Sequence, residues 1–303
     1  MTQLPEKKKV FLNEEKFLQQ YNADDYVHPS VAADMVIFTV MDAPETNYRK
    51  LPEKQLCVLL IRRGMHPFLG QWALPGGFVR PNETVGNAAR RELREETGLD
   101  NVYMEQLCTF SEPDRDPRTR VISCAHMALV NSANLQLAAG DDADRAAWFR
   151  CSSQLLSESR ETHTMGCTIA KRFLFHLSGE NIQINYTLEH KISHTTHSVT
   201  DEYAIIENTG LAFDHARILA LALERLRGKL EYTGIALHLM PARFTLTQLQ
   251  QVYEVILGRP LLATAFRRKI APLVRGTDEY TSDAGHRPSQ LFERNWDNIA
   301  ELI

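Results

Sequence analysis

The chain has 303 residues, enough for two domains, and its 44% hydrophobic and 24% charged content is ordinary for a globular protein. Its formal net charge of −4 gives no global reason to expect nucleic-acid binding, so that function would have to rest on a local basic patch. The apolar runs are far shorter than the roughly 20 residues of a membrane helix, and the five scattered cysteines indicate neither disulfides nor a zinc site; we expect a cytoplasmic protein with no membrane contact.

The first half of the chain predicts an α+β domain. A polar extension with a helical pattern over 14–20 precedes runs of apolar and β-branched residues that predict strands. An Ala-rich helical pattern lies among these strands and stops at Gly98. We predict an extension over 1–30 and a domain over 31–155, with a helix at 84–96 and strands at 36–40, 56–61, 103–110, 121–130 and 146–149.

The segment 156–208 is predicted to connect two domains. Two alternating runs, 172–177 and 182–188, flank a Ser-Gly-Glu-Asn sequence and predict a β-hairpin. A polar stretch with three histidines follows, and we interpret it as a solvated loop, with a metal site as the alternative. These histidines are His190, His194 and His197.

The last part of the chain, 209–303, predicts helices followed by a hairpin. An amphipathic helix over 214–226 has Asp214 as its expected N-cap, and a second helix over 246–257 opens with the capping-box pair Thr245 and Gln248. Gly258 and Pro260 end the second helix. A third helix is predicted at 263–273, and strand-like pieces at 279–281 and 290–292. This order of elements is typical of a winged helix-turn-helix domain.

The helix at 84–96 carries three carboxylates on one face. At about 100° per residue, Glu92, Glu95 and Glu96 fall within an arc of roughly 100°. Carboxylate oxygens with a few waters suit Mg²⁺ or Mn²⁺, and the preceding glycines Gly76 and Gly77 let backbone approach such an ion. The alternative is an acidic helix face exposed to solvent. A further pair, Arg91 and Glu83, is placed to tie the glycine loop to the helix.

This stretch resembles the Nudix box, whose pattern G-x5-E-x7-R-E-U-x-E-E-x-G-U is matched at every specified position from Gly77 to Leu99. The resemblance implies a Nudix α/β/α sandwich that binds a nucleoside diphosphate and uses metal ions to activate water. It implies that the metal ligands, and in an active member the catalytic residues, are Glu92, Glu95 and Glu96. It also implies a contribution from the Gly76 carbonyl to the metal and contact of Gly77 with the ligand.

A general base is not part of the box. In related ADP-ribose hydrolases it comes from a later loop, which here points to the acidic run 140–144. We assign this role to Asp142, with its neighbours Asp141 and Asp144 as alternatives. An acidic surface turn is an equally good interpretation of each of these residues.

The segment 111–120 is rich in arginine and acidic residues. Its arginines Arg115, Arg118 and Arg120 have the fork-shaped guanidinium that binds phosphate oxygens in pairs, and they follow directly after a predicted strand. We predict that they contact the ligand. The alternative is a loop held by its own salt bridges.

The third C-terminal helix carries a basic face. Apolar residues recur at 266, 270 and 273 and predict its buried side. Residues 259–294 hold seven Lys/Arg and four Asp/Glu, so this segment is net positive within an acidic chain. We predict that the exposed side enters a major groove and that Arg287 in the wing reaches the minor groove. The alternative is a winged helix that only dimerises or binds protein. The predicted DNA-binding residues are Thr264, Arg267, Arg268, Arg275 and Arg287.

A box of this kind followed by such a domain resembles the Nudix-related transcriptional regulators of NAD metabolism (NrtR). The residues that carry the resemblance lie at 67–70 and 105–120 in the first domain and at 213–216, 226–232, 244–246, 257–260 and 266–269 in the second. It covers roughly 25–150 and 209–294 and leaves 156–208 largely unmatched. It implies a homodimer that binds double-stranded operator DNA and responds to ADP-ribose or a related nucleotide. Because the box is intact, the alternative is a Mg²⁺-dependent ADP-ribose diphosphatase whose winged helix only dimerises.

Overall fold

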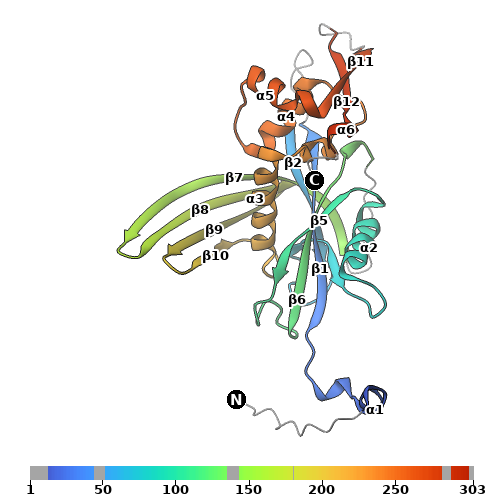
Figure 1. Cartoon of the computed structure of the whole chain (residues 1–303), viewed down its shortest axis with the longest axis vertical. Coiled ribbons are helices and arrows are strands. Elements are labelled where there is room, and N and C mark those ends of the chain that lie inside the picture. The colour runs from blue at the N-terminus through green and yellow to red at the C-terminus, as the bar shows by residue number, and fades with distance from the viewer. Residues whose placement is uncertain (1–12, 44–51, 135–142, 180, 282–287, 300–303) are drawn as a thin grey trace.

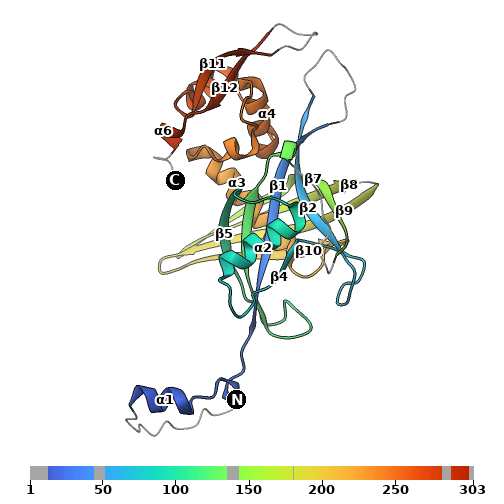
Figure 2. The same cartoon turned by 90° about the vertical axis from the view of Figure 1, so that its right-hand side faces the viewer.

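The computed structural model describes residues 13–43, 52–134, 143–179, 181–281 and 288–299, with backbone alone at 134, 143–145 and 299. Figure 1 shows a central sheet covered by helices, a set of long strands that project from it, and a helical domain at the C-terminal end. A short N-terminal helix, α1 (Glu14–Gln20), stands away from the rest (Figures 1 and 2) and has no buried residue.

One mixed sheet runs through the first two parts of the molecule. Its strand order is β10-β9-β8-β7-β2-β1-β6-β5, with β3 beside β2 and β4 beside β1. β1 and β6 pair in parallel, and the other pairs of the sheet are antiparallel. The strands are β1 (Ser30–Asp42), β2 (Lys54–Arg63), β3 (Trp72–Ala73), β4 (Gly76–Phe78), β5 (Tyr103–Phe110), β6 (Val121–Leu129), β7 (Ala143–His163), β8 (Gly166–Gly179), β9 (Ile182–Thr195) and β10 (Val199–Asn208).

The two faces of β1 pack against different helices, which makes the central part an α/β/α sandwich as expected. Met35 and Ile37 belong to an apolar cluster with helix α2 (Val85–Thr97). Val36 and Phe38, which point to the opposite face, belong to a larger cluster with helix α3 (His215–Tyr232). Both faces are therefore buried, and this explains why the strand is apolar almost throughout.

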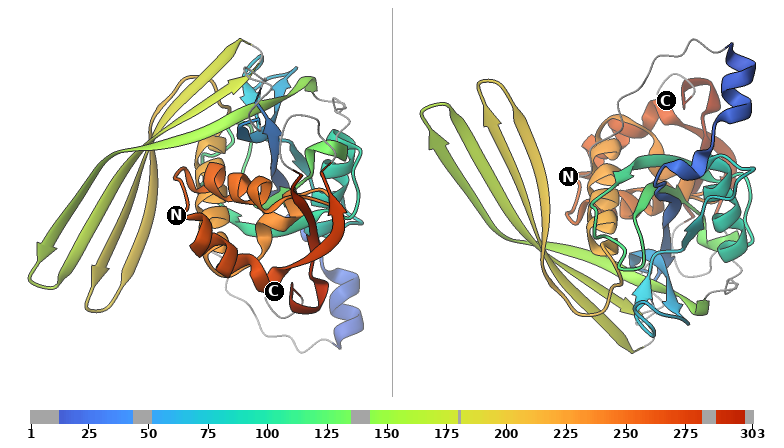
Figure 3. Two further views of the ribbon diagram at one scale, coloured as in Figure 1. Left: turned by 90° about the horizontal axis from the view of Figure 1, so that it is seen from above. Right: turned by 90° about the horizontal axis from the view of Figure 1, so that it is seen from below.

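The strands β7–β10 correct the prediction for residues 143–208. Before the predicted hairpin, a strand was expected at 146–149 alone, but β7 continues through residue 155, where the first domain was predicted to end. The predicted hairpin is present between β8 and β9, as the middle of four antiparallel strands that reach away from the body of the molecule (Figure 3).

The polar stretch with three histidines is not a solvated loop over its whole length. His190 and His194 lie on β9. His190 is 6% exposed, its Nε2 lies 2.7 Å from Asp201 Oδ1, and its ring stacks on Tyr203 at 4.1 Å between centroids. Its partners come from the neighbouring strand β10, which local patterns could not place beside it.

The C-terminal part has the expected winged helix order. It contains η3 (Ile235–Leu239), α4 (Leu246–Leu257), α5 (Ala263–Ile270), η4 (Ala271–Leu273), the hairpin β11 (Val274–Tyr280) and β12 (Gln290–Arg294), and α6 (Trp296–Ile299). The capping box of Thr245 and Gln248 is present, and Gly258 caps the end of α4 in the left-handed conformation. The predicted third helix is shorter than expected, because its last turn is the 3₁₀ turn η4.

Helix α3 joins the sandwich to the winged helix domain. Its buried side chains share one apolar core with the sheet, with α4 and with α5. Near its C-terminal end, Arg227 donates to the Ile256 carbonyl (2.8 Å), and the Leu230 carbonyl accepts from Lys269 (2.8 Å). None of the helices in the described part of the chain combines the length and apolar character that a membrane crossing requires.

We expect Leu226→Ala to lower the free energy of unfolding by about 2–5 kcal/mol, because this side chain of α3 is 0% exposed and its truncation leaves a cavity in the shared core. Denaturant titration measures the change. The matched control is Leu262→Ala, whose side chain is 78% exposed and whose removal should change stability by no more than about 0.5 kcal/mol. Equal losses for the two variants would contradict the shared core.

Candidate functional site

The acidic face of α2 lies at the edge of the sheet. Leu93 points into the core, and Glu92 and Glu96 are buried beside it at 7% and 4% exposed. Glu95 is exposed. The helix begins after Thr84, whose side chain accepts from Asn87 N–H, and ends at Gly98, so local sequence signals set the phase that places these carboxylates together.

Arg91 organises these carboxylates. Its guanidinium lies 2.8 Å from Glu83, 2.6 Å from Glu92 and 3.3 Å from Glu95, and it donates to the Phe78 carbonyl (3.3 Å). The expected tie between the glycine loop and the helix, Arg91 to Glu83, is therefore present. Hydrogen bonds from Arg91 and from the Arg80 backbone lower the pKa of Glu83 to about 2, so this carboxylate is ionised across the physiological range.

Gly76 and Gly77 sit where a side chain would collide with its neighbours. A Cβ at Gly76 would lie 2.6 Å from the Ala33 carbonyl oxygen, and one at Gly77 would lie 2.9 Å from Glu92 Cδ. The glycine strand β4 can therefore pack directly on β1 and on the carboxylate of Glu92.

The chemistry of these side chains fits a hard divalent cation. Carboxylate oxygens crowd one helical face beside backbone that carries no side chain, and burial raises the pKa of Glu92 despite its contact with Arg91. A bound cation would favour the ionised form of this group and offset the cost of burying it. Among the described residues, no three His, Cys, Asp or Glu side chains converge closely enough to hold a metal ion as they stand.

A cleft of about 860 Å³, open to solvent, lies beside the glycine strand. One wall comes from Gly76, Gly77 and Phe78 and another from the loop 111–120 through Arg115, Asp116 and Arg118. Phe213 and His215, at the start of α3, close a third side. Backbone, charged and aromatic groups therefore surround one open cleft.

The three arginines of the loop have different surroundings. Arg118 lines the cleft, is bound to Asp116 (2.7 and 3.0 Å) and has its guanidinium 5.6 Å from the centre of the Phe78 ring. Arg120 donates to the carbonyls of Ser111 (2.7 Å) and Glu112 (3.0 Å), and so it holds the loop closed. Arg115 also lines the cleft but is bound internally. Of these three arginines, Arg118 forms a salt bridge within the loop, Arg120 bonds loop carbonyls, and Arg115 pairs with carboxylates outside the loop. Their contact with a ligand stays a prediction.

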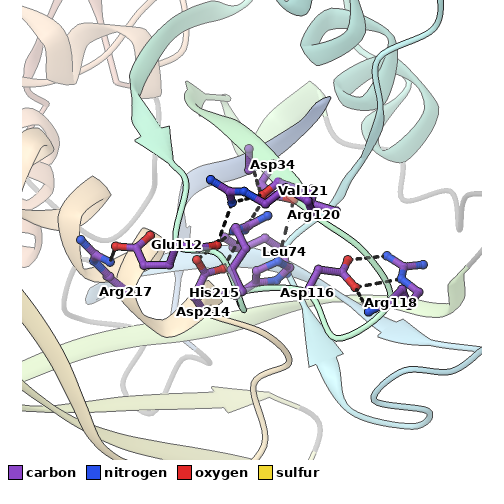
Figure 4. A network of polar contacts seen from close by, with 12 residues as sticks. Asp34, Leu74, Glu112, Asp116, Arg118, Arg120, Val121, Asp214, His215 and Arg217 are labelled. Carbon is purple, nitrogen blue, oxygen red and sulfur yellow. Dashed lines mark hydrogen bonds and ion pairs between the residues drawn. The ribbon is translucent and has the colours of Figure 1, made fainter. Parts of the chain in front are cut away.

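Arg115 belongs to a polar network whose members Asp34, Asp214 and His215 are labelled in Figure 4. It donates to both oxygens of Asp214 (2.7 and 3.0 Å) and to Asp34 Oδ2 (3.1 Å). Ser123 donates to the same Asp34 oxygen at 2.6 Å. Asp214 was expected to cap α3 through its side chain, but it makes no side-chain cap bond, because Arg115 takes both carboxylate oxygens.

His215 completes the network. The Leu74 N–H donates to its Nδ1 at 2.9 Å, so the ring proton sits on Nε2, 3.8 Å from Asp34 Oδ1. Burial lowers the pKa of His215, which keeps the ring neutral at physiological pH. Asp34, Phe213 and His215 were not predicted as site residues. The signal for Asp34 was available: a carboxylate inside an apolar strand needs a buried partner.

Some predicted site residues cannot be placed. Asp142 and Arg287 lie outside the described residues, as does Asp141, and Asp144 is described by its backbone alone. Their predicted roles remain predictions.

The predicted DNA-binding residues do not all share one helix. Thr264, Arg267 and Arg268 are exposed on α5, where Phe266 and Ile270 form the buried side as expected. Arg275 lies on β11 instead, because the helix ends five residues before it, and its guanidinium lies 3.0 Å from Asp297.

Comparison with known proteins agrees with this architecture. Residues 49–164 match the NUDIX domain model, and residues 236–293 match the NrtR DNA-binding winged helix domain model. The chain is 33% identical over 288 residues to the "ADPR responsive transcriptional repressor NtrR" of Acinetobacter baylyi, covering 93% of this chain and 88% of that protein. This chain belongs to the NrtR family. The alignment covers more of the chain than the 25–150 and 209–294 that carried the resemblance.

Two other similarities cover part of the chain and most of it, respectively. The chain is 44% identical over 124 residues to the "ADP-ribose pyrophosphatase" of Methanocaldococcus jannaschii, which covers 41% of this chain and 63% of that enzyme. The solved structure of "Shewanella oneidensis NrtR complexed with a 27mer DNA" is 26% identical, with a TM-score of 0.56, over 89% of this chain and 95% of that one.

We expect Gly77→Ala to weaken Mn²⁺ binding, because the added methyl group displaces the Glu92 carboxylate. Titration followed by electron paramagnetic resonance measures free Mn²⁺ without any need for activity. Gly86→Ala is the control: its Cβ would meet only Arg90 Nη1, at 3.6 Å, and should leave the affinity unchanged. Equal Mn²⁺ affinity in Gly77→Ala and the native protein would contradict a cation site at this face.

Proposed function

We propose that this protein is a transcriptional regulator that binds operator DNA and responds to ADP-ribose or a related nucleotide diphosphate. The observation that carries the proposal is the joining of an intact Nudix box and its cleft, through helix α3, to a winged helix with an exposed basic helix. The similarity to an ADPR-responsive repressor over 93% of the chain supports it.

The Nudix domain acts as the receiver of the signal in this proposal. Mg²⁺ or Mn²⁺ held by Glu92, Glu95 and Glu96, with the Gly76 carbonyl, would neutralise the charge of the diphosphate. Gly77 and Arg118 border the cleft where the ligand would lie. The described contacts of Arg115 and Arg120 are internal, so the ligand must compete for Arg115, whereas Arg120 positions the loop.

The winged helix supplies the DNA-binding surface in this proposal. Thr264, Arg267 and Arg268 project from α5 into solvent, and no ion pair within the described part of the chain occupies the two arginines. They are available for phosphates and guanine edges. Arg287 in the wing would reach the minor groove, and Arg275 on β11 would contact the DNA backbone.

A homodimer in the cytoplasm completes the proposal. A short winged helix reads only a few base pairs, so two copies related by a two-fold axis would recognise a palindromic operator with far greater specificity. Ligand and DNA binding are then linked: if ADP-ribose weakens DNA binding, DNA weakens ADP-ribose binding by the same factor.

A specific observation also favours a second function, Mg²⁺-dependent hydrolysis of ADP-ribose. Every specified position of the Nudix box is present, and 124 residues are 44% identical to an ADP-ribose pyrophosphatase. In this reading Glu92, Glu95 and Glu96 hold the metal that activates water, and Asp142 is the general base.

Arg267→Ala and Arg268→Ala should each weaken operator binding, by about 1–3 kcal/mol where the arginine reads a base. Fluorescence anisotropy with a DNA fragment from upstream of the protein's own gene measures the change at fixed salt. Arg94→Ala removes an exposed charge from α2, outside the winged helix, and should bind DNA like the native protein. Unchanged affinity in both α5 variants would contradict the assigned surface, and no binding by the native protein at low salt would contradict the regulator itself.

If the enzyme function is present, purified protein with Mg²⁺ or Mn²⁺ should release AMP and ribose 5-phosphate from ADP-ribose. Glu96→Gln should abolish this release, because it removes one proposed metal-binding charge from the buried face of α2. Chromatography of the nucleotides measures the products, and Glu158→Gln on the projecting strand β7 is the control. Intact ADP-ribose after hours with native protein would exclude hydrolysis while leaving the regulator proposal untouched.

A further inference from the structure

The first residues of α3 are also a wall of the cleft. Phe213 and His215 line it, and Asp214 between them is bound to Arg115. Phe213 has a left-handed backbone (φ 52°), which is unfavourable for a residue with a large side chain and is held by its surroundings. Its ring lies 4.9 Å from the Arg63 guanidinium and 4.7 Å from the ring of Phe68. Whatever fills the cleft therefore touches the start of α3 directly.

The sheet anchors the segment before this turn. The Trp72 N–H donates to the Gly210 carbonyl (3.1 Å), and the Ala212 N–H donates to the Trp72 carbonyl (2.8 Å). The chain is thus held at residues 210 and 212 and changes direction at Phe213, and the next contact with this segment is the bond from the Leu74 N–H to the His215 ring (2.9 Å). This arrangement makes residues 213–215 a joint between a rigid sheet and a helix.

The other end of α3 holds the winged helix. Arg227 is bonded to the last turn of α4, and the Leu230 carbonyl is bonded to Lys269 of α5. A helix of 18 residues is about 27 Å long and stiff over that length. A small rotation of α3 about residues 213–215 would therefore shift α4 and α5 relative to the sheet, because both contact the C-terminal end of α3.

Within the described network, Arg115 is the cation that contacts the start of α3 and also lines the cleft. Its guanidinium is shared by Asp214 of α3 and Asp34 of β1, and it lines the cleft. A diphosphate in the cleft would offer oxygens that match the same fork of donors. If Arg115 turns to the ligand, Asp214 loses its partner and faces a second carboxylate, Asp34, across the joint.

We propose that the ion pair between Arg115 and Asp214 is the switch contact of this protein: the ligand diphosphate draws Arg115 from Asp214, releases the first turn of α3, and so moves the winged helix. The inference rests on the proposed function and names the positioning residues that couple its two sites. Arg115 and Asp214 act through α3 and need not touch DNA.

The test compares the full-length native protein with Asp214→Asn, which keeps the size of the side chain and removes its charge. Operator affinity is measured by fluorescence anisotropy with and without saturating ADP-ribose, and ADP-ribose affinity is measured by calorimetry without DNA. In the native protein ADP-ribose should raise the Kd for DNA, by about 5–150-fold if the coupling is of ordinary size. In Asp214→Asn this factor should fall towards one, while ADP-ribose binds at least as tightly because Arg115 is released.

The chain offers a matched control in Glu112→Gln. Glu112 and Arg217 form another ion pair between the same loop and the same helix, but neither residue lines the cleft. This variant should keep the native coupling factor. A loss of coupling equal to that in Asp214→Asn would show that any loop–helix contact matters and would overturn the switch.

The outcomes distinguish a failure of the switch contact from a failure of the proposed regulator function. If the native protein binds DNA and ADP-ribose with coupling, and Asp214→Asn keeps the native factor, the switch is wrong and the regulator stands. If the native protein binds neither, the proposed function fails. If Asp214→Asn does not fold, Arg115→Lys decides, because lysine keeps the charge but cannot hold both Asp214 oxygens in a fork; native coupling in that variant would overturn the switch.

Discussion

The guanidinium of Arg115 lies between two carboxylates that belong to different parts of the molecule, Asp34 in the central strand and Asp214 at the start of α3. Neither carboxylate has another cation at comparable distance within the described network, so this one charge links the central strand to the start of α3. Burying such a charge is costly, and a buried ion pair is seldom worth more than the apolar packing that could replace it. The pair instead fixes the position of the start of α3 relative to β1. That position then depends on whether Arg115 binds Asp214 or another group.

The cation site depends on the same strand. Asp34 is paired with Gly76 in the ladder of β1 and β4, and a Cβ at Gly76 would lie 2.9 Å from Asp34 Oδ1. The next residue, Gly77, packs on the Glu92 carboxylate of α2. Two consecutive residues of one short strand therefore touch the proposed metal face on one side and the α3 network on the other. The same close packing that lets backbone reach a metal-bound diphosphate also places the ligand beside the joint.

The sequence predicted what is encoded locally. Helices α2 and α4 have the expected bounds within a residue or two, because Thr84, Gly98, the Thr245–Gln248 box and Gly258 are signals that act within one or two turns. The sandwich and the Arg91–Glu83 tie followed from the box. The hairpin between β8 and β9 was expected, but the full length of β7–β9 and the whole of β10 were not. β10 is exposed at every position except Tyr203, so its pattern carries no buried face to recognise. The partners of Asp214 and His190 also come from distant segments or other strands, and capping rules could not reveal them. The placement of Arg275 failed because η4 ends the helical phase before that residue.

The network also limits how far ligand binding can change the affinity for DNA. If Arg115 leaves, Asp34 keeps the hydrogen bond from Ser123 and the proton of His215 nearby, so β1 is only partly destabilised. Asp214 has no such substitute, but its side chain is 16% exposed and can turn to water when the first turn of α3 moves. Loss of the ion pair therefore destabilises the start of α3 more than the sheet. An effector can shift a two-state equilibrium only by its difference in affinity for the two states. If that difference lies in how the start of α3 packs on the sheet, and not in the sheet itself, the cleft can change the winged helix without unfolding the domain that binds the ligand.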